Sequence, residues 1–297
     1  MAFSRSSSNP NSLFCECPLC SSTYHKVVYK MCKMSSPLAI PGSLLHCSNC
    51  GMLYKGRISL ESMEHAYEGE YASTAKSETY MSSDVTRRFF RKVLKQINSE
   101  RSSYRPKLLD IGTGMGTLLE EAQSLGYDPE GIELCPELAD IARQKGLKVH
   151  HMNAMCLNEP EKYDVITMMD IIEHIPHPVA LLRVLHRNLK PGGKLVVYTP
   201  NHRGAIVILA KLMAKIGMNF AIHEIFGGNH VCFFDDHTLP AALHSVGFKM
   251  RYLWKFSYDP NRPGQKVSLV NLAIVTAVEL LGRPFGLVFR MVAYAQK

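Results

Sequence analysis

Four cysteines near the start of the chain have the type and spacing of metal ligands. Cys17 and Cys20 form the pair in "CPLC", and Cys47 and Cys50 form the pair in "CSNC". Each CxxC pair makes a tight turn, and two such pairs present four thiolates to one tetrahedral Zn²⁺. The chain begins without an apolar secretory segment, so we expect reduced thiols that bind metal rather than disulfides. The spacing therefore predicts structural zinc in a segment too small for a core of its own.

A glycine-rich loop follows an apolar segment in "LLDIGTGMG" and leads into a helical pattern. Gly112, Gly114 and Gly116 are spaced G-x-G-x-G, whereas a dinucleotide-binding loop needs its third glycine where this chain has Thr117. Asp110 precedes the loop, and its carboxylate would repel a pyrophosphate but attract the ammonium and sulfonium groups of S-adenosylmethionine. The loop therefore favours S-adenosylmethionine over NAD; a tight turn without a ligand is the alternative.

Two further polar residues stand at the ends of the next predicted strands. The second predicted strand ends in "GIEL", which places Glu133 at its tip. There its carboxylate could accept hydrogen bonds from ribose hydroxyls. Asn153 follows the third strand, where it could line the adenine edge of the same cofactor.

Candidates for the chemistry of methyl transfer lie after the fourth strand and in the insertion 201–238. They are Asp170, Glu173 and His174 in "DIIEH", and His223, Glu224 and His230 further on. A general base is needed where the accepting atom must lose a proton, and carboxylates with an imidazole could also hold a hard cation. Asp170 could instead contact the cofactor, Glu173 and His174 could only shape its pocket, and His230 could be a buried histidine that fixes the insertion.

The order of apolar segments predicts the elements that must position these residues. After Pro106 strands alternate with helices of ten to fifteen residues, which implies a parallel sheet with right-handed crossovers. The predicted strands are 107–112, 128–134, 147–153, 163–170, 194–200, 248–256 and 287–297, the last antiparallel to its predecessor, and the predicted helices are 83–103, 116–126, 136–146, 178–193 and 238–247.

The motifs "DIGTGMG", "GIEL", "EHIPHP…LKPGG…TPN" and "HVCFFDDHTLPAALHSVGF" resemble the class I S-adenosylmethionine-dependent methyltransferases. The resemblance implies a Rossmann-like α/β fold with a seven-stranded sheet, its last strand antiparallel. It implies cofactor contacts at Asp110, Gly112, Gly114 and Glu133.

Two narrower resemblances concern the chemistry and the N-terminal segment. "DIIEH" resembles the E-x-x-E-H element of the O-methyltransferases of ubiquinone synthesis, which is associated with a divalent cation; Asp170 replaces its first Glu. "CPLC…HCSNCGMLY" followed by "YEGEY" resembles bacterial methyltransferases in which a zinc ribbon precedes a small-molecule methyltransferase, some acting on nucleotide-linked deoxysugars. That resemblance implies substrate contacts at Tyr67, Tyr71 and Tyr80, for which aromatic packing is the alternative.

The chain thus divides into a tail at 1–14, a zinc ribbon at 15–57, a Tyr-rich connection with a helix at 58–105, and a methyltransferase domain at 106–297. The formal net charge is +8, and residues 1–105 hold 14 Lys and Arg against 8 Asp and Glu. This excess suits an anionic substrate, RNA or a membrane surface, and the missing secretory signal predicts a cytoplasmic location.

The leading hypothesis is a methyltransferase acting on a small polar metabolite, anionic or glycosylated. One alternative is an rRNA methyltransferase whose ribbon grips RNA, although the ribbon is not densely basic and no N-P-P-[FYW] tetrad is present. The other is a quinone or lipid O-methyltransferase docking on a membrane through the apolar helices at 205–218 and 268–281, which could equally form a lid. Neither helix has the roughly 20 uninterrupted apolar residues of a membrane span. The oligomeric state is left open.

Overall fold

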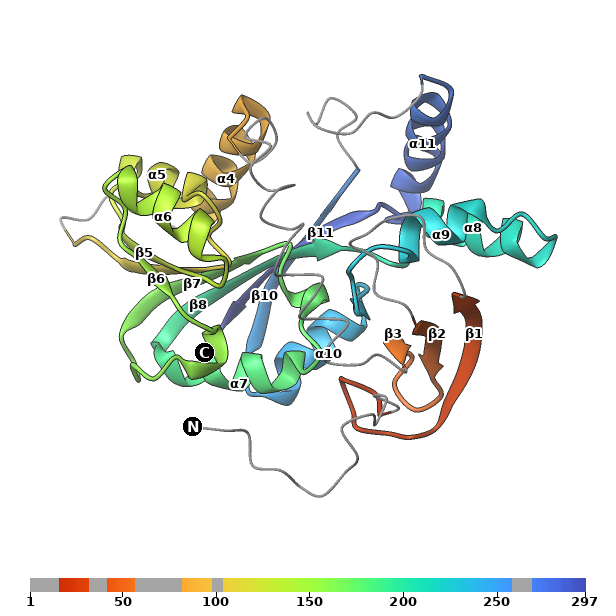
Figure 1. Ribbon diagram of the computed structural model, residues 1–297, viewed down its shortest axis with the longest axis horizontal. Coiled ribbons are helices and arrows are strands. Elements are labelled where there is room, and N and C mark those ends of the chain that lie inside the picture. The colour runs from red at the N-terminus through yellow and green to blue at the C-terminus, as the bar shows by residue number, and fades with distance from the viewer. Residues whose placement is uncertain (1–15, 32–41, 57–81, 98–103, 258–268) are drawn as a thin grey trace.

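A seven-stranded mixed sheet forms the centre of the structure, a computed structural model that describes residues 16–31, 42–56, 82–97, 104–257 and 269–297 (Figure 1). The strand order is β10-β11-β8-β7-β4-β5-β6, with β11 antiparallel to both neighbours and the other pairs parallel. The strands are β4 (Lys107–Ile111), β5 (Asp128–Glu133), β6 (Val149–His151), β7 (Tyr163–Met169), β8 (Leu189–Pro200), β10 (Lys249–Phe256) and β11 (Arg290–Gln296). The predicted fold class is confirmed.

Helices cover both faces of this sheet because alternate strand residues point to opposite sides. In β8, Leu195 and Val197 join one buried cluster, whereas Val196 and Tyr198 join another. The first cluster includes α7 (Pro178–Asn188) and α10 (Thr238–Ser245), and the second includes α4 (Asp84–Ile97), α5 (Thr117–Ser124) and α6 (Pro136–Gln144). Figure 1 shows the two helix groups on either side of the sheet.

One predicted boundary is wrong: the helix expected over 178–193 ends at Asn188, and β8 already begins at Leu189. Pro191 cannot donate a helical backbone bond and disfavours the helical conformation of Lys190. Leu189 is instead buried and pairs with Tyr163 of β7. The burial of Leu189 on the sheet therefore decides the boundary.

A second, four-stranded sheet joins the N-terminal segment to the insertion. Its order is β1-β2-β3-β9, from β1 (His25–Met31), β2 (Gly42–Cys47), β3 (Leu53–Gly56) and β9 (Cys232–Phe233). Tyr54 pairs with Cys232, and Leu53 with Phe233. Tyr54 also belongs to the buried cluster of α7 and α10, so this small sheet packs beside those helices.

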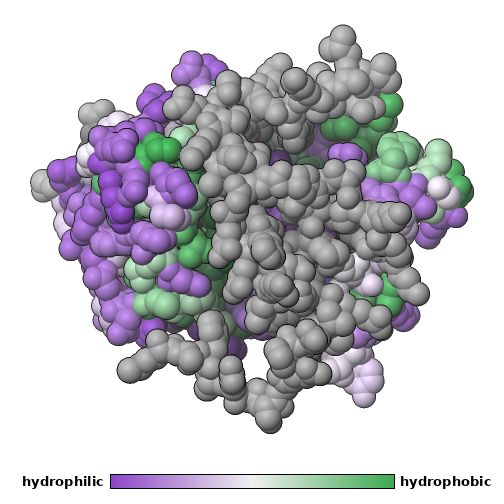
Figure 2. Space-filling model, in the orientation of Figure 1, coloured by the Kyte–Doolittle hydropathy of each residue, from purple (hydrophilic) through white to green (hydrophobic). Residues whose placement is uncertain are grey.

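The rest of the insertion consists of α8 (Ala205–Lys215) and α9 (Phe220–Phe226), and α8 also contacts α11 (Leu269–Gly282). The predicted helices at 205–218 and 268–281 are therefore confirmed as helices. Their exposed apolar side chains include Ile208, Leu212, Ile216, Ile274, Leu280 and Leu281, and Figure 2 shows green, apolar surface over the ends of both helices. No helix within the described ranges is both long enough and apolar enough to cross a membrane.

Candidate functional site

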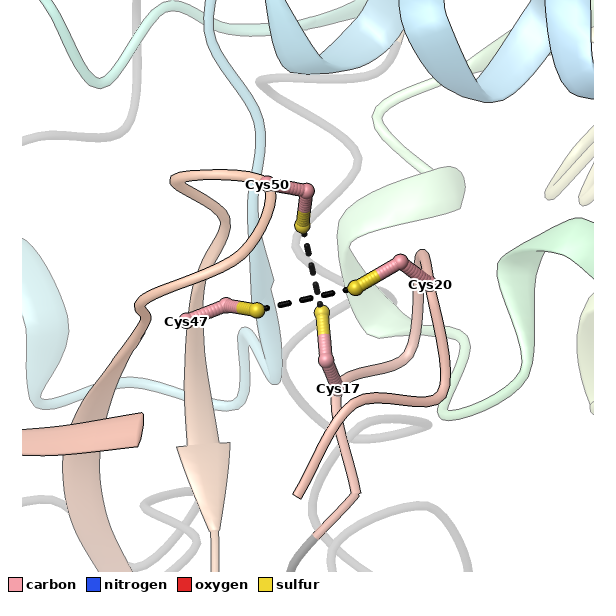
Figure 3. Close-up of side chains that lie close together, drawn as sticks. All are labelled: Cys17, Cys20, Cys47 and Cys50. Atoms are coloured by element: carbon pink, nitrogen blue, oxygen red, sulfur yellow. Dashed lines mark hydrogen bonds between the residues drawn. The ribbon is translucent and has the colours of Figure 1, made fainter. Parts of the chain in front are cut away.

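The four cysteines of the two CxxC pairs converge, as Figure 3 shows. The Sγ atoms of Cys17 and Cys50 are 3.5 Å apart, those of Cys20 and Cys47 are 3.6 Å apart, and all four lie within 4.8 Å of one another. Two sulfur ligands of one tetrahedral Zn²⁺ lie about 3.8 Å apart, because each Zn–S bond is about 2.3 Å long. Burial raises the pKa of the Cys17 thiol to about 12. A cation would compensate that burial, so donor type and spacing both fit zinc.

The glycine loop between β4 and α5 has a backbone that requires glycine. Gly112, Gly114 and Gly116 have φ angles of 71°, 56° and 82°, in the left-handed region that side chains disfavour. Added Cβ atoms would lie 2.1 Å from Ile171 Cδ1 at Gly112 and 2.2 Å from Leu147 Cδ1 at Gly116. The loop is therefore fixed in shape by packing as well as by its dihedral angles.

Glu133, at the end of β5, is tied to this loop. Its Oε2 accepts a hydrogen bond from the Gly114 N–H at 2.8 Å, and its Oε1 accepts one from the Cys135 N–H at 2.9 Å. The side chain is buried, and burial raises its pKa although the backbone bonds oppose the shift. The structure thus brings Glu133 and the glycine loop together at the carboxyl ends of neighbouring strands, where open α/β sheets bind ligands.

Asp110, at the end of β4, is also buried, and the Thr167 hydroxyl donates a hydrogen bond of 2.6 Å to its Oδ1. Burial raises the pKa of the Asp110 carboxyl to about 7, and the charge of Glu133 contributes in the same direction. Two carboxyls in one small volume favour a cationic ligand. Asn153 lies beyond β6, and its side-chain oxygen accepts the Met155 N–H at 2.9 Å.

Asp170 follows β7 in the left-handed conformation, with a φ of 54°. Arg290 of β11 places its Nη1 3.2 Å from the Asp170 carboxylate. Burial raises the pKa of Asp170, and the positive charge of Arg290 opposes the shift. Sequence reasoning missed Arg290, although a lone charge in the apolar run "LVFRMVAYA" indicates a cation that needs a partner inside the fold.

Glu173, His174 and His230 form a compact cluster of possible ligand atoms, all within 4.8 Å of one another. The two imidazole rings meet edge to face with centroids 4.7 Å apart. Glu173 is fully buried, and its Oε2 accepts a hydrogen bond of 2.9 Å from the Thr199 hydroxyl. Its Oε1 and the Nδ1 of His174 are buried and make no hydrogen bond with the described residues. A bound molecule or ion at this cluster would therefore meet two buried polar atoms that the described residues leave unpartnered.

Burial keeps this cluster largely uncharged. It raises the pKa of Glu173 to about 8, with the charge of Asp170 adding to the shift. It lowers the pKa of His174 to about 4, and it lowers the pKa of His230 well below its ordinary value. Both imidazoles are therefore neutral near pH 7, so each offers a ring-nitrogen lone pair to a hydrogen-bond donor or to a cation.

Backbone hydrogen bonds connect this cluster to the N-terminal sheet. The Val231 N–H donates to the Glu173 carbonyl at 2.8 Å, and the Lys55 N–H donates to the Val231 carbonyl at 2.8 Å. Lys55 of β3 is itself buried, and its ammonium group donates to the carbonyl of Gly228. Sequence reasoning missed Lys55, because nothing in "MLYKG" indicates which strand will pair beside it.

The predicted candidates His223 and Glu224 lie on α9 and are not part of this cluster. The Nε2 of His223 lies 3.2 Å from the Tyr29 hydroxyl of β1, and Glu224 is exposed. Tyr67, Tyr71 and Tyr80 lie outside the described residues. The structure therefore assembles Glu173, His174 and His230 from the predicted set and places Asp170 beside them in an ion pair.

Comparison with known proteins agrees with the fold in indicating a methyltransferase. The sequence profile of a family described as "Methyltransferase domain" matches residues 81–253. A ubiquinone biosynthesis O-methyltransferase of Xanthomonas euvesicatoria is 30% identical over 172 residues, covering 54% of this chain and 70% of its own. Its counterpart in Xanthomonas oryzae is 33% identical over the same shares.

Solved structures share the fold at low sequence identity. The Haloferax volcanii complex of the Trm112 methyltransferase activator with a putative methyltransferase matches with a TM-score of 0.56 and 15% identity, covering 76% of this chain and 95% of that one. A methyltransferase from Archaeoglobus fulgidus matches with a TM-score of 0.51 and 20% identity, covering 75% of this chain and 98% of that one.

Proposed function

The chain belongs to the S-adenosylmethionine-dependent methyltransferases, and from this premise we propose that it methylates a hydroxyl oxygen of a small molecule at the cluster of Glu173, His174 and His230. The observation that carries the proposal is a pair of buried polar atoms in that cluster, Oε1 of Glu173 and Nδ1 of His174, that have no hydrogen-bond partner among the described residues. A hydroxyl group of the substrate would supply a hydrogen-bond partner at this place.

We propose that the cofactor binds to residues at the carboxyl ends of β4, β5, β6 and β7. When bound, S-adenosylmethionine supplies an electrophilic methyl group, whose carbon–sulfur bond breaks as the new oxygen–carbon bond forms. The glycine loop provides a close backbone approach, Glu133 receives the ribose hydroxyls, and Asp110 attracts the cationic end. The full set is Asp110, Gly112, Gly114, Gly116, Glu133, Asn153 and Asp170.

The proton of the substrate hydroxyl passes to a neutral imidazole, His174 or His230. Low pKa values keep both rings unprotonated, so a ring nitrogen is available to take up that proton as the methyl group is transferred. The same three side chains have the donor types for a divalent cation, which would lower the pKa of a bound hydroxyl. The relatives named O-methyltransferases support oxygen as the acceptor atom.

We further propose that Cys17, Cys20, Cys47 and Cys50 hold a structural zinc ion. The metal would fix β2 and β3, and β3 pairs with β9 beside the cluster. The zinc site would thus act on catalysis by positioning Lys55 and His230.

The test is transfer of a labelled methyl group from S-adenosylmethionine into fractionated cell extract, with and without Mg²⁺ or Mn²⁺. His230→Asn and Glu173→Gln are expected to lower kcat by about 100-fold, the usual contribution of acid–base catalysis, while S-adenosylhomocysteine binding is unchanged. His244→Asn, at an exposed position on α10, is the matched control. Undiminished transfer by His230→Asn would refute the role of the cluster, and label in RNA would favour an RNA substrate.

A second candidate substrate class, a quinone or lipid, is favoured by the exposed apolar side chains of α8 and α11. Leu212 and Ile216 are 53% and 73% exposed, and Leu281 is 74% exposed. Helices of this kind can bury their apolar face in a membrane interface. Sedimentation with phosphatidylglycerol vesicles that is abolished by Leu212→Ser and Ile216→Ser, together with label in the lipid fraction, would establish this alternative.

A further inference from the structure

Lys55 is a buried cation whose charge has no carboxylate partner within the described part of the chain. Its side chain is 2% exposed, and its Nζ donates to the carbonyl oxygen of Gly228. Burial lowers the pKa of the ammonium group to about 7. A buried charge costs free energy unless it is paired. Burial of the Lys55 ammonium group is therefore unfavourable in the absence of a bound anion.

The position of Lys55 places that charge at the proposed reaction site. Its backbone N–H bonds to Val231, directly after His230. Its charge is close enough to lower the pKa values of His174 and His230. The other cation of the site, Arg290, already has Asp170 as its partner. Among the described residues, Lys55 is therefore left without a carboxylate partner and can pair with an anion on a bound molecule.

We propose that Lys55 binds an anionic group, a carboxylate or a phosphate, on the methyl-accepting substrate and so holds the substrate hydroxyl against the cluster of Glu173, His174 and His230. This inference rests on the function proposed above for that cluster. An anion at Nζ would pair the buried charge and add to the hydrogen bond that Nζ donates to Gly228, which makes recognition of the charged group strong.

The selectivity would come from the N-terminal sheet, not from the methyltransferase fold. Lys55 lies outside residues 81–253, the part of the chain that matches the family profile. It reaches the site because β3 pairs with β9 of the insertion. The N-terminal module would thus select anionic substrates for a catalytic centre built by other elements.

The experiment measures binding of three small probes to the zinc-loaded full chain with S-adenosylhomocysteine present: benzoate, phenyl phosphate and neutral benzamide. Wild-type protein is expected to bind one of the anions more tightly than benzamide, and the better anion identifies the group. Lys55→Met should weaken anion binding by about 10- to 100-fold, the value of a hydrogen bond to a charged group, and leave benzamide unaffected. Lys55→Arg should retain most of the anion affinity.

The control is Lys26→Met, which removes an exposed lysine of β1 in the same sheet. Equal affinity of wild-type protein for all three probes would overturn the proposal, and this measurement needs no variant to fold. Unchanged anion affinity in Lys55→Met would overturn it as well. The function proposed for the cluster fails separately, if His230→Asn retains full methyl transfer.

Discussion

Replacing Glu133 with Gln tests whether this carboxylate organises the cofactor site. Glu133 accepts two backbone N–H groups, from Gly114 at 2.8 Å and from Cys135 at 2.9 Å. A glutamine has one oxygen, so it can accept only one of them, and its NH₂ group faces the other N–H. The loss of one hydrogen bond to a charged group, with a buried donor left unpaired, should reduce the free energy of unfolding by about 1.5–3 kcal/mol.

The same substitution should weaken cofactor binding. If Glu133 also accepts the ribose hydroxyls, the affinity for S-adenosylhomocysteine falls by about 10- to 100-fold in Glu133→Gln. Urea unfolding measures the first effect and titration calorimetry the second, both at pH 8. Glu224→Gln is the matched control, because Glu224 is exposed on α9. An unfolding midpoint and an affinity that both equal those of wild-type protein would refute this reasoning.

Three further predictions follow from the proposed zinc site, from Asp110 and from the packing of the glycine loop. Cys50→Ser should release the bound zinc, measured by elemental analysis, and reduce methyl transfer at least about tenfold while S-adenosylhomocysteine affinity persists; full activity without zinc would contradict the positioning role. The pKa of Asp110 is raised from 3.8 to about 7, so the folded protein holds a proton that the unfolded chain releases, and stability falls as pH rises from about 4 to 7. Asp110→Asn should therefore melt at a higher temperature than wild-type protein at pH 8 and at the same temperature at pH 4, and equal melting temperatures at both values would exclude the shift. In Gly131→Ala the new Cβ would lie 2.6 Å from Thr113 Cγ2, and such overpacking costs about 1–3 kcal/mol of unfolding free energy, whereas Gly228→Ala meets open space and should cost less than half as much.

Much of the main sheet was predictable because its signals are local. Strand and helix periods in "KLLDI" and "PELADIARQ" correspond to β4 and α6, since each element buries an apolar face defined by its own residues. The glycine spacing predicted a loop with restricted geometry, and all three glycines have positive φ. The two CxxC pairs predicted the meeting of four thiols because that pattern is typical of a four-cysteine metal site.

The sequence alone therefore determined the sheet, the glycine loop and the cysteine cluster, whose chemistry resides in short contiguous motifs. Tertiary structure decided which residues meet at the proposed reaction site. Residues 53–54 pair with residues 232–233, which lie far from them in the sequence, and that pairing brings Lys55 beside His230. Arg290 of the last strand likewise comes from a distant segment to pair with Asp170, which interacts with Glu173 of the cluster. Such contacts depend on the burial of apolar surface contributed by distant segments, so no local pattern encodes them.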